Sequence, residues 1–369
     1  MNIKVLHLLD SLNRGGAEML ILDVCRNAKA NDLDLTLAAT GGGALETDFE
    51  NSGVEFVRLK RRLPIDLRVI VQLRKIIKDR EIEIVHTQQA VEAVHAYLAC
   101  QGTKTRIVLT HQGFIHDKKN LLTLRFLIPR VSINVVVSRA LVKWYESENG
   151  LKFPANTKIL HNGVDEKRLT GDGEKFKREL GLADGDLLIG MIANFYRNPR
   201  KDQMTVCRAL PKVFAEIENA HCVFAGKVEA GAEDKFKECI DFCLAYNISD
   251  RVHFLGGRSD VPEILAALDF FVFSSLQEGL PVAAAEAMLA RVPLIVSDIE
   301  PLLEASANGE YAEVFPVGNH EILSEKITKF LQDKNLREDL ATRAFHYARE
   351  NFSIEAHLRE LKKLYQSIL

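Results

Sequence analysis

The stretch LDFFVFSSLQEGLPVAAAEAMLARVPLIVSDI, residues 268–299, contains the alternation that decides the fold. It begins with an apolar run of strand length, continues through a turn-rich loop into an alanine-rich segment of helical composition, and ends in a second apolar run, VPLIVS. Pro281 suits the first turn of the helix, where its missing N–H has no partner to lose. Strand, loop, helix and buried strand in this order predict a βαβ unit with two parallel strands.

Two glutamates lie in this stretch. Glu278 is in the loop before the helix, and Glu286 is in the apolar helix about 12 Å further along its axis, so both can face the same side. A carboxylate buried in such apolar sequence needs a partner. The alternative is one acid favoured by the helix dipole and one solvent-facing glutamate, and spacing alone leaves both interpretations open.

Composition and charge indicate a globular chain that is long enough for two domains. Of its 369 residues, 47% are hydrophobic and 27% are charged. Residues 1–165 carry a net charge of +5 and the remainder carries −8, so different partners are expected for the two halves. The overall charge of −3 does not suggest binding to nucleic acid.

Cysteine usage and the amino terminus favour a cytoplasmic protein. The six cysteines lie in apolar contexts without Cys-x-x-Cys spacing, as expected for buried thiols in a reducing compartment. The start, MNIKVLHLLD, is too short an apolar run for a signal peptide, and no stretch approaches the ~20 apolar residues of a membrane span.

A basic and apolar segment at 118–130, KKNLLTLRFLIPR, allows two interpretations. Together with Lys60, Arg61 and Arg62 it could make peripheral contact with the inner face of a membrane. A core-facing helix with a solvated basic face explains the same pattern.

Strand and helix patterns alternate along the whole chain and predict an α/β fold of two Rossmann-like, doubly wound domains. We place these domains at residues 1–165 and 166–351, followed by a final helix at 352–369. Strands are expected at 3–9, 35–40, 54–59, 82–86, 106–110, 135–138, 187–193, 222–225, 252–256, 268–273, 292–297 and 312–316.

Ligands of open parallel sheets bind at the carboxyl ends of the strands. Gly15 and Gly16 follow the first strand and open a helix, which presents backbone N–H groups to an anion, although Gly-Gly also marks ordinary turns. His86 and His111 each end a strand. A lone histidine is usually structural. Two at successive strand ends raise the odds of a functional role, and for His86 both interpretations stay open.

Two glycine motifs are expected to form turns. The run GGG at 41–43 predicts a flexible turn. Asn162-Gly163 predicts a tight turn between the domains that tolerates left-handed backbone.

These motifs together resemble the retaining, metal-independent glycosyltransferases of the GT-B fold, family 4. The resemblance covers nearly the whole chain and implies two Rossmann-like domains that face across a cleft, with the last helix crossing back onto the first domain. The motifs that carry it are GGAE at 15–18, Thr110-His111, Val137-Ser138, NGVD at 162–165, Lys201-Asp202 and EGLPVAAAEAM at 278–288.

The resemblance implies that a nucleotide-sugar binds mainly to the second domain. Glu286 would accept hydrogen bonds from the ribose, and Glu278 would hold hydroxyls of the sugar. Gly279 and Leu280 would complete the donor loop. In the first domain, Gly15 and Gly16 would lie against the donor phosphates, and His111 would lie beside the transferred sugar.

The resemblance also implies a cationic clamp for the departing diphosphate. Lys201 and Arg197 would form this clamp, with Arg200 as the rival of Arg197, and solvated cations are the alternative. Fixed cations can neutralise a diphosphate without a metal, so neither a metal nor another cofactor is expected.

The implied reaction moves a sugar from a UDP- or GDP-sugar to an acceptor hydroxyl with retention of configuration. Retaining hydrolases use a carboxylate nucleophile, but no carboxylate is obviously placed for that role, and a front-face reaction is expected. Enzymes of this kind often build lipopolysaccharide, capsule or other surface glycans, which implies a glycan or lipid-linked acceptor. Two other functions stay open: a GT-B nucleotide-sugar epimerase, and a non-catalytic subunit that binds a nucleotide-sugar.

Overall fold

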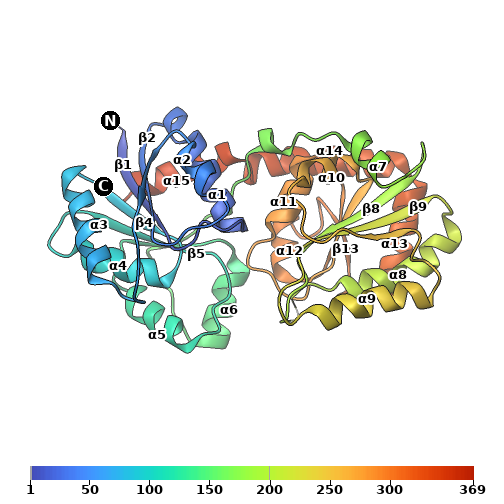
Figure 1. The fold of residues 1–369 in the computed structure, drawn as a ribbon, viewed down its shortest axis with the longest axis horizontal. Coiled ribbons are helices and arrows are strands. Elements are labelled where there is room, and N and C mark those ends of the chain that lie inside the picture. Colours follow the sequence, from blue (N-terminus) through green and yellow to red (C-terminus); the bar gives the residue numbers. More distant parts are fainter. Residues whose placement is uncertain (1, 199) are drawn as a thin grey trace. The chain divides into compact units, whose positions relative to one another are not determined.

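The computed structural model describes residues 2–198 and 200–369 and divides the chain into two compact units. Unit 1 contains the residues up to Val164 together with Ile354–Leu369, and unit 2 contains Asp165–Ser353. The boundary falls one residue before the position expected from the sequence. In each unit, helices cover both faces of a sheet (Figure 1).

Unit 1 is built on a seven-stranded parallel sheet with the order β3-β2-β1-β4-β5-β6-β7. The chain runs outward from β1 to β3 and then returns to β4, so the direction of winding reverses between β1 and β4. This is the place where open α/β sheets bind ligands. The strands are β1 (Ile3–Leu9), β2 (Leu33–Ala39), β3 (Glu55–Arg58), β4 (Ile84–Thr87), β5 (Arg106–His111), β6 (Ile133–Val136) and β7 (Thr157–Ile159).

Helices α3, α4 and α5 of unit 1 pack side by side, and α1 packs against α15 (Figure 1). Helix α15 joins unit 1 because Ile354, Leu358 and Leu361 enter the same buried cluster as the apolar residues of β1 and β2. The helices are α1 (Gly16–Asn27), η1 (Lys29–Asn31), α2 (Glu46–Glu50), α3 (Leu67–Asp79), α4 (Ala90–Cys100), α5 (Lys118–Leu127), α6 (Arg139–Asn149) and α15 (Ile354–Gln366).

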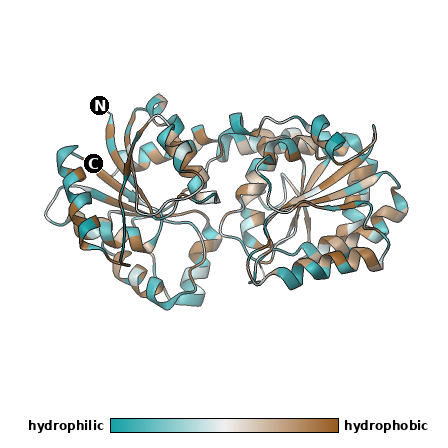
Figure 2. Ribbon diagram, viewed as in Figure 1, coloured by the Kyte–Doolittle hydropathy of each residue, from teal (hydrophilic) through white to brown (hydrophobic). Residues whose placement is uncertain are grey.

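Unit 2 contains a six-stranded parallel sheet with the order β10-β9-β8-β11-β12-β13. Two of its neighbouring strands, β11 and β12, are buried along their whole length, and strands and helices alternate around an apolar interior (Figure 2). They are β8 (Leu187–Ile192), β9 (Ala220–Ala225), β10 (Val252–Phe254), β11 (Phe270–Phe273), β12 (Leu294–Ser297) and β13 (Glu313–Phe315). The helices are η2 (Glu166–Leu169), α7 (Gly173–Glu179), α8 (Gln203–Glu216), α9 (Glu233–Ala245), α10 (Val261–Ala267), α11 (Val282–Leu289), α12 (Glu300–Ala305), α13 (His320–Gln332) and α14 (Lys334–Asn351).

Each strand expected from the sequence is present within two residues at either end, but several local details differ. Strand β6 ends at Val136, so Ser138 does not end a strand. Its Oγ instead accepts a hydrogen bond from Leu141 N at 3.1 Å and caps α6. Helix α8 was not predicted, because Pro211 interrupts its pattern, although Asp202 caps its start. Residues 300–305 form a short helix.

The two glycine motifs serve close packing and not the turn conformations expected for them. Neither Asn162 nor Gly163 has a positive φ, nor does any glycine of 41–43. A Cβ at Gly163 would lie 2.6 Å from His357 Cβ, so the absence of a side chain at Gly163 allows α15 to pack closely here. A Cβ at Gly41 would lie 2.1 Å from Asp10 O, and one at Gly43 would lie equally close to the Leu12 carbonyl carbon. The run GGG therefore fits against the loop that follows β1.

A buried hydrogen-bonded cluster fastens α15 to the sheet of unit 1. Tyr365 Oη lies 2.7 Å from His86 Nδ1 and 3.1 Å from His7 Nε2, and His86 Nε2 lies 2.6 Å from Thr110 Oγ1. Burial lowers the pKa of His7 to about 3 and that of His86 well below its usual value, so both are neutral at neutral pH. Both ring nitrogens of His86 have partners inside the unit, which favours its structural interpretation.

Replacing Tyr365 by Phe is expected to lower the free energy of unfolding by about 1–3 kcal/mol, because it leaves buried imidazole nitrogens without a partner. Urea unfolding of the full chain measures this change. Tyr246→Phe, at a side chain that is 56% exposed, is the matched control and should change stability by less than about 0.5 kcal/mol. Equal stability of the two variants would contradict a role for Tyr365 in holding α15.

Candidate functional site

Two loops of unit 2 are joined at the carboxyl ends of neighbouring strands. One loop follows β8 and the other follows β11, and β8 pairs with β11 in the sheet. Leu276 N donates a hydrogen bond to Arg200 O at 2.7 Å, and Asp202 N donates one to Ser274 O at 3.1 Å. These bonds fix the position of Lys201 relative to the loop that carries Glu278.

Lys201 and Glu278 form an ion pair whose side chains are each only 11% exposed. Lys201 Nζ also lies 4.0 Å from the centroid of the Phe273 ring. Burial lowers the pKa of Lys201, and the Glu278 carboxylate opposes that shift. Breaking a buried pair is costly unless each charge finds a new partner. A ligand at this position must therefore offer an anion to Lys201 and hydrogen-bond donors to Glu278.

Serines that the sequence analysis missed hold the Glu278 loop. Ser275 Oγ contacts Glu278 Oε1 and lies 2.7 Å from Arg200 O. Ser297 Oγ, at the buried end of β12, accepts from Ser275 N at 3.0 Å and donates to Ser275 O at 2.8 Å. In the sequence, only the position of Ser275 three residues before Glu278 could have indicated its role. Ser297 could not have been found in this way, because it reaches the loop only through the pairing of β11 with β12.

Glu286 has the partner that its apolar surroundings demand. Its Oε1 accepts a hydrogen bond from Arg168 Nη2 at 2.8 Å, and both side chains are mostly buried. Arg168 lies in η2, 118 residues away in the sequence, so no local pattern could identify it. Glu278 and Glu286 thus have different cationic partners. Gly279 and Leu280, which lie between them in the sequence, are half-buried.

The two candidate arginines lie in different surroundings. Arg197 is exposed, and a Cβ at Gly231 would lie 3.2 Å from its Cδ, so its side chain packs on that glycine. Arg200 is half-buried, with its guanidinium 5.6 Å from the Tyr196 ring centroid, and its charge contributes to the lowered pKa of Lys201. Of the two, Arg200 is the one whose charge acts on the Lys201 ammonium.

In unit 1, Gly15 is the N-cap of α1 and Gly16 is its first residue. The preceding loop is held in place by backbone bonds on either side of Leu12, to Gly42 and Leu45. A Cβ at Gly15 would lie 2.6 Å from Glu18 Oε2, so this carboxyl covers the helix start. Burial raises the pKa of Glu18. An anion that binds at the start of α1 must either displace the Glu18 carboxyl group or share a proton with it.

His111 ends β5 and is buried. Its Nε2 lies 3.2 Å from Asn134 Oδ1, and its ring meets the edges of Tyr145 and Phe153. Burial lowers the pKa of His111 to about 4, although Asn134 opposes the shift, so the imidazole is neutral at neutral pH. It can therefore donate one hydrogen bond but does not supply a positive charge.

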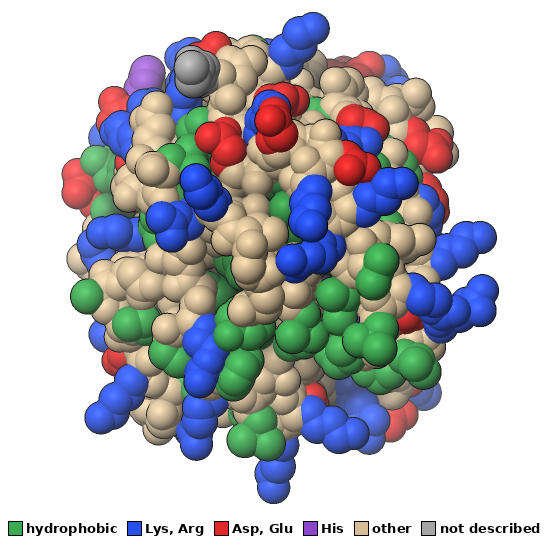
Figure 3. Space-filling model, turned by 90° about the vertical axis from the view of Figure 1, so that its left-hand side faces the viewer, with side chains coloured by type: hydrophobic (Ala, Val, Ile, Leu, Met, Phe, Trp, Pro, Cys, Tyr) green, Lys and Arg blue, Asp and Glu red, His purple; other side chains and the backbone are tan. Residues whose placement is uncertain are grey.

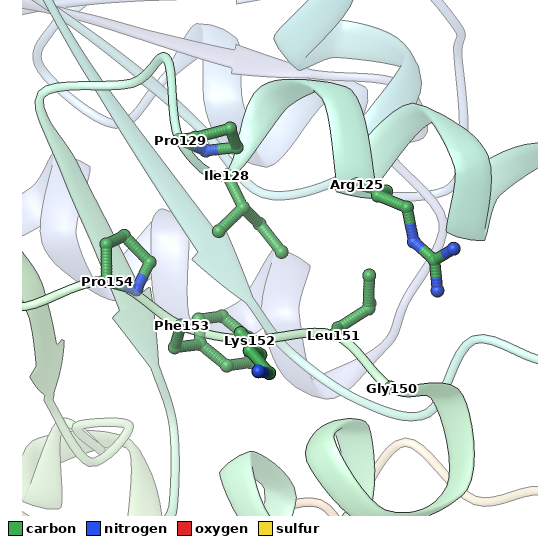
Figure 4. A pocket seen from close by; sticks show the side chains of 8 residues that line it. All are labelled: Arg125, Ile128, Pro129, Gly150, Leu151, Lys152, Phe153 and Pro154. Atoms are coloured by element: carbon green, nitrogen blue, oxygen red, sulfur yellow. The ribbon is translucent and has the colours of Figure 1, made fainter.

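Phe153 also lines a depression of about 490 Å³ (Figure 4). The end of α5 contributes Arg125, Ile128 and Pro129, and the segment 150–154 forms the opposite wall. Apolar side chains form the floor, and the Arg125 and Lys152 side chains are exposed.

Three side-chain amides connect the strand ends of unit 1. Asn162 Nδ2 donates to Gln112 Oε1 at 2.9 Å, and Gln112 Nε2 donates to Gln88 Oε1 at 2.8 Å. Asn162 therefore braces the ends of β4 and β5.

The sequence contains two Asp-x-Asp triplets, Asp32–Asp34 and Asp184–Asp186, a pattern that can bind a metal ion. Asp32 pairs with Lys362 at 2.8 Å, and Asp186 accepts a hydrogen bond from Ala183 N at 2.7 Å. The two triplets lie at the amino ends of β2 and β8, away from the carboxyl end that carries Lys201. Within residues 2–198 and 200–369, no group of three or more His, Cys, Asp or Glu side chains is arranged to hold a metal ion.

Glu92 is a buried carboxyl in the first turn of α4 that the sequence analysis did not single out. Neither of its oxygens has a hydrogen bond of ordinary geometry. Burial, and then the negative charge of Asp10, raise the pKa of Glu92 to about 8, although Arg61 opposes the shift. Arg61 itself pairs with Asp10 at 2.6 Å. These three ionisable groups form a cluster beside the carboxyl end of β1.

Two family descriptions match most of the chain between them. "Glycosyltransferase Family 4" matches residues 14–168, and "Glycosyl transferases group 1" matches residues 172–347.

Several characterised proteins are similar in sequence. The N-acetyl-alpha-D-glucosaminyl L-malate synthase of Bacillus anthracis is 25% identical over 315 residues, which cover 83% of this chain and 80% of the relative. The UDP-Gal:alpha-D-GlcNAc-diphosphoundecaprenol alpha-1,3-galactosyltransferase of Escherichia coli is 24% identical over 80% of both chains. The lipopolysaccharide core biosynthesis mannosyltransferase LpsB of Rhizobium meliloti is 23% identical over 84% of this chain and 87% of that protein.

Solved structures share the fold. HepE of Anabaena, determined with UDP, superposes with a TM-score of 0.85 at 20% identity and covers 99% of this chain and 100% of its own. WaaG, a glycosyltransferase of lipopolysaccharide biosynthesis, superposes with a TM-score of 0.70 at 15% identity over 98% of this chain and 99% of its own.

Replacing Glu92 by Gln is expected to stabilise the protein increasingly as pH rises from 5 to 8. Unfolded glutamate ionises near pH 4.3, whereas folded Glu92 retains its proton to about pH 8. Between these values the folded state binds more protons, so wild-type stability falls as pH rises, by at most about 1.4 kcal/mol per pH unit. Gln removes this dependence. Urea unfolding at several pH values measures the difference.

The exposed Glu238 provides the control for this experiment. Glu238→Gln should leave the pH dependence of unfolding unchanged. A wild type and a Glu92→Gln variant with parallel stability curves would show that folded Glu92 ionises normally.

Proposed function

Because the chain belongs to the family 4 glycosyltransferases of the GT-B fold, we propose that it transfers a sugar from a nucleoside diphosphate sugar to an acceptor hydroxyl with retention of configuration. A UDP-sugar is the first donor to test, since HepE was determined with UDP and with UDP-glucose, and a GDP-sugar is the second.

The observation that carries this proposal is the buried pair of Lys201 and Glu278. The diphosphate of a donor replaces Glu278 as the anion beside Lys201. Glu278 is then free to accept hydrogen bonds from sugar hydroxyls. Each charge thus exchanges one partner for another, which avoids leaving a buried charge unpaired. Arg200 adds a second cation beside Lys201, and this argues for Arg200 over Arg197 in the diphosphate clamp.

Glu286 is proposed to accept hydrogen bonds from the ribose. Arg168 orients the Glu286 side chain, so that its remaining lone pairs are available to the two hydroxyls. Gly279 and Leu280 connect the two carboxylates through the loop that precedes α11. The start of α11 adds a favourable dipole for negative charge.

The reaction is proposed to take place on one face of the sugar. The bond between the anomeric carbon and the diphosphate oxygen breaks, and a bond from the same carbon to the acceptor oxygen forms. The acceptor proton passes to the departing diphosphate oxygen. Lys201 stabilises the charge that develops on that oxygen, which is the task of a fixed cation in the absence of a metal. Neutral His111 is suited to a hydrogen bond and not to charge stabilisation.

The acceptor is proposed to meet unit 1, which carries the net positive charge of the chain. Named relatives act on diphosphoundecaprenol-linked sugars or on the lipopolysaccharide core. A lipid-linked or glycan acceptor in the synthesis of surface polysaccharide, on the cytoplasmic side of the membrane, is therefore the best-supported substrate class.

Removing the ion pair without leaving a lone buried charge tests this mechanism. The double variant Lys201→Met/Glu278→Gln should fold with near-normal stability, since replacing both partners of a buried pair is often neutral. Its turnover should fall at least about 10²-fold, because the diphosphate loses its fixed cation. Donor consumption and glycoside formation, followed by NMR with UDP-sugars and GDP-sugars, provide the measurement.

Lys212→Met/Glu325→Gln is the matched control, because Lys212 and Glu325 form an exposed pair at 3.5 Å in the same unit. It should retain full turnover. Near-normal turnover of the Lys201/Glu278 variant would overturn the proposed site. A product of inverted configuration would refute retention, and loss of turnover with a chelator would refute metal independence.

The same assay separates the remaining alternatives. Arg200→Ala should reduce turnover more than Arg197→Ala, and the opposite order would restore Arg197 to the clamp. Epimerised donor without glycoside would identify an epimerase. Stabilisation by a nucleotide-sugar in a thermal-shift assay without any donor turnover would identify a binding subunit.

A further inference from the structure

Helix α4 lies between α3 and α5 and presents an apolar face to solvent. Its only charged residue, Glu92, is buried. Val91, Val94 and Tyr97 are partly exposed, and Leu98 is exposed. A helix that is apolar on every side is normally covered on every side, yet nothing in the described chain covers this face of α4.

The two helices that pack against α4 also carry exposed apolar side chains. Leu67 and Val71 of α3 are 74% and 67% exposed, and Leu122 of α5 is 66% exposed. Leu63, Ile65 and Phe126 are also exposed, and the Phe126 ring meets the edge of Tyr97 at 5.6 Å. Together with the apolar face of α4 these residues form what we name the α3–α5 face. Seven of the thirteen large apolar side chains that are exposed among the described residues lie in residues 63–126.

The segments that carry this apolar surface are rich in cations. Residues 60–79 contain seven basic and two acidic side chains, and residues 117–130 contain four basic and one acidic. One of the acids, Asp66, is buried and paired with Arg68. Figure 3 shows hydrophobic side chains gathered among Lys and Arg on the side of the molecule that carries unit 1, with acidic side chains concentrated in the upper part of the view.

We propose that the α3–α5 face docks on the surface of an anionic lipid bilayer. Its exposed leucine, valine and phenylalanine side chains enter the boundary between headgroups and acyl chains, and the surrounding Lys and Arg side chains meet lipid phosphates. This inference does not depend on the proposed chemistry of Lys201 and Glu278. Among the described residues, no helix is both long enough and apolar enough to cross the bilayer, and the proposed contact is peripheral.

A second copy of this chain is a poorer occupant of the α3–α5 face. A two-fold interface brings the same patch of both copies together, so the basic borders of one copy would face those of the other. Like charges that are brought together in this way repel. An anionic bilayer matches the charge and the apolar side chains at once.

A depression on the flank of α5 fits the same occupant. It lies between α5 and the end of α6, and it is lined by Leu121, Leu122, Lys118, Arg125 and Asn149. Arg125 also borders the larger depression shown in Figure 4. Apolar walls beside two cations suit one acyl chain and its phosphate.

Vesicle flotation of the full-length protein tests the proposal. Wild type should float with vesicles of phosphatidylcholine and phosphatidylglycerol, and at least tenfold less with phosphatidylcholine alone. About 1 M salt should weaken this binding, because it shortens the Debye length to about 3 Å. Leu67→Ser/Val71→Ser and Lys118→Glu/Lys119→Glu should each reduce binding to anionic vesicles at least tenfold without changing the melting temperature.

Leu244→Ser/Tyr246→Ser is the matched control, since both side chains are 56% exposed on unit 2, and it should float like wild type. Absence of flotation with anionic vesicles would overturn the proposal, as would undiminished flotation of the two unit 1 variants. A dimer in light scattering that Leu67→Ser/Val71→Ser dissociates would assign the face to a second copy. Because flotation needs no donor, its failure is distinguishable from failure of the proposed transfer.

Discussion

The ion pair between Lys201 and Glu278 constrains the whole candidate site of unit 2. Its two members follow neighbouring parallel strands, and the pair forms only because β8 and β11 end at the same edge of the sheet. Backbone bonds between the two loops and the hydroxyl groups of Ser275 and Ser297 hold the pair in a mostly buried site. Such a pair is costly to disturb without compensation. A substrate that carries both an anion and hydroxyl groups supplies that compensation.

Unit 1 binds α15, a helix from the far end of the chain, through its own set of contacts. Helix α15 is bound by apolar packing and by the Tyr365 hydroxyl between two neutral histidines. Glycine at position 163 is needed because His357 passes so close to it. His86, which ends a strand and could have been functional, is occupied by this task. His111 has no contact with Tyr365 among the described interactions, and its neutral imidazole remains a candidate for contact with substrate.

If the proposed transfer uses a lipid-linked acceptor, the α3–α5 face and the proposed donor site would serve complementary needs. The bilayer concentrates such an acceptor at its surface, and a peripheral contact through unit 1 would place the enzyme where the acceptor is. Cations near the surface give this contact an electrostatic component that salt weakens, whereas the buried Lys201–Glu278 pair is much less sensitive to screening. The two sites can therefore be distinguished by their response to ionic strength.

The sequence by itself determined the α/β class and the succession of most strands along the chain, and its motifs singled out Lys201, Glu278 and Glu286 as candidates. Period and composition report which residues are buried in strands and helices, and the motif from Glu278 to Glu286 is local. Only the tertiary structure decided the partners. Arg168 reaches Glu286 across 118 residues, Ser297 reaches Ser275 through a neighbouring strand, and the glycines at 41–43 serve a contact with the loop after β1. Such contacts depend on which strands lie side by side in the sheet. A periodic pattern along the sequence does not contain that information.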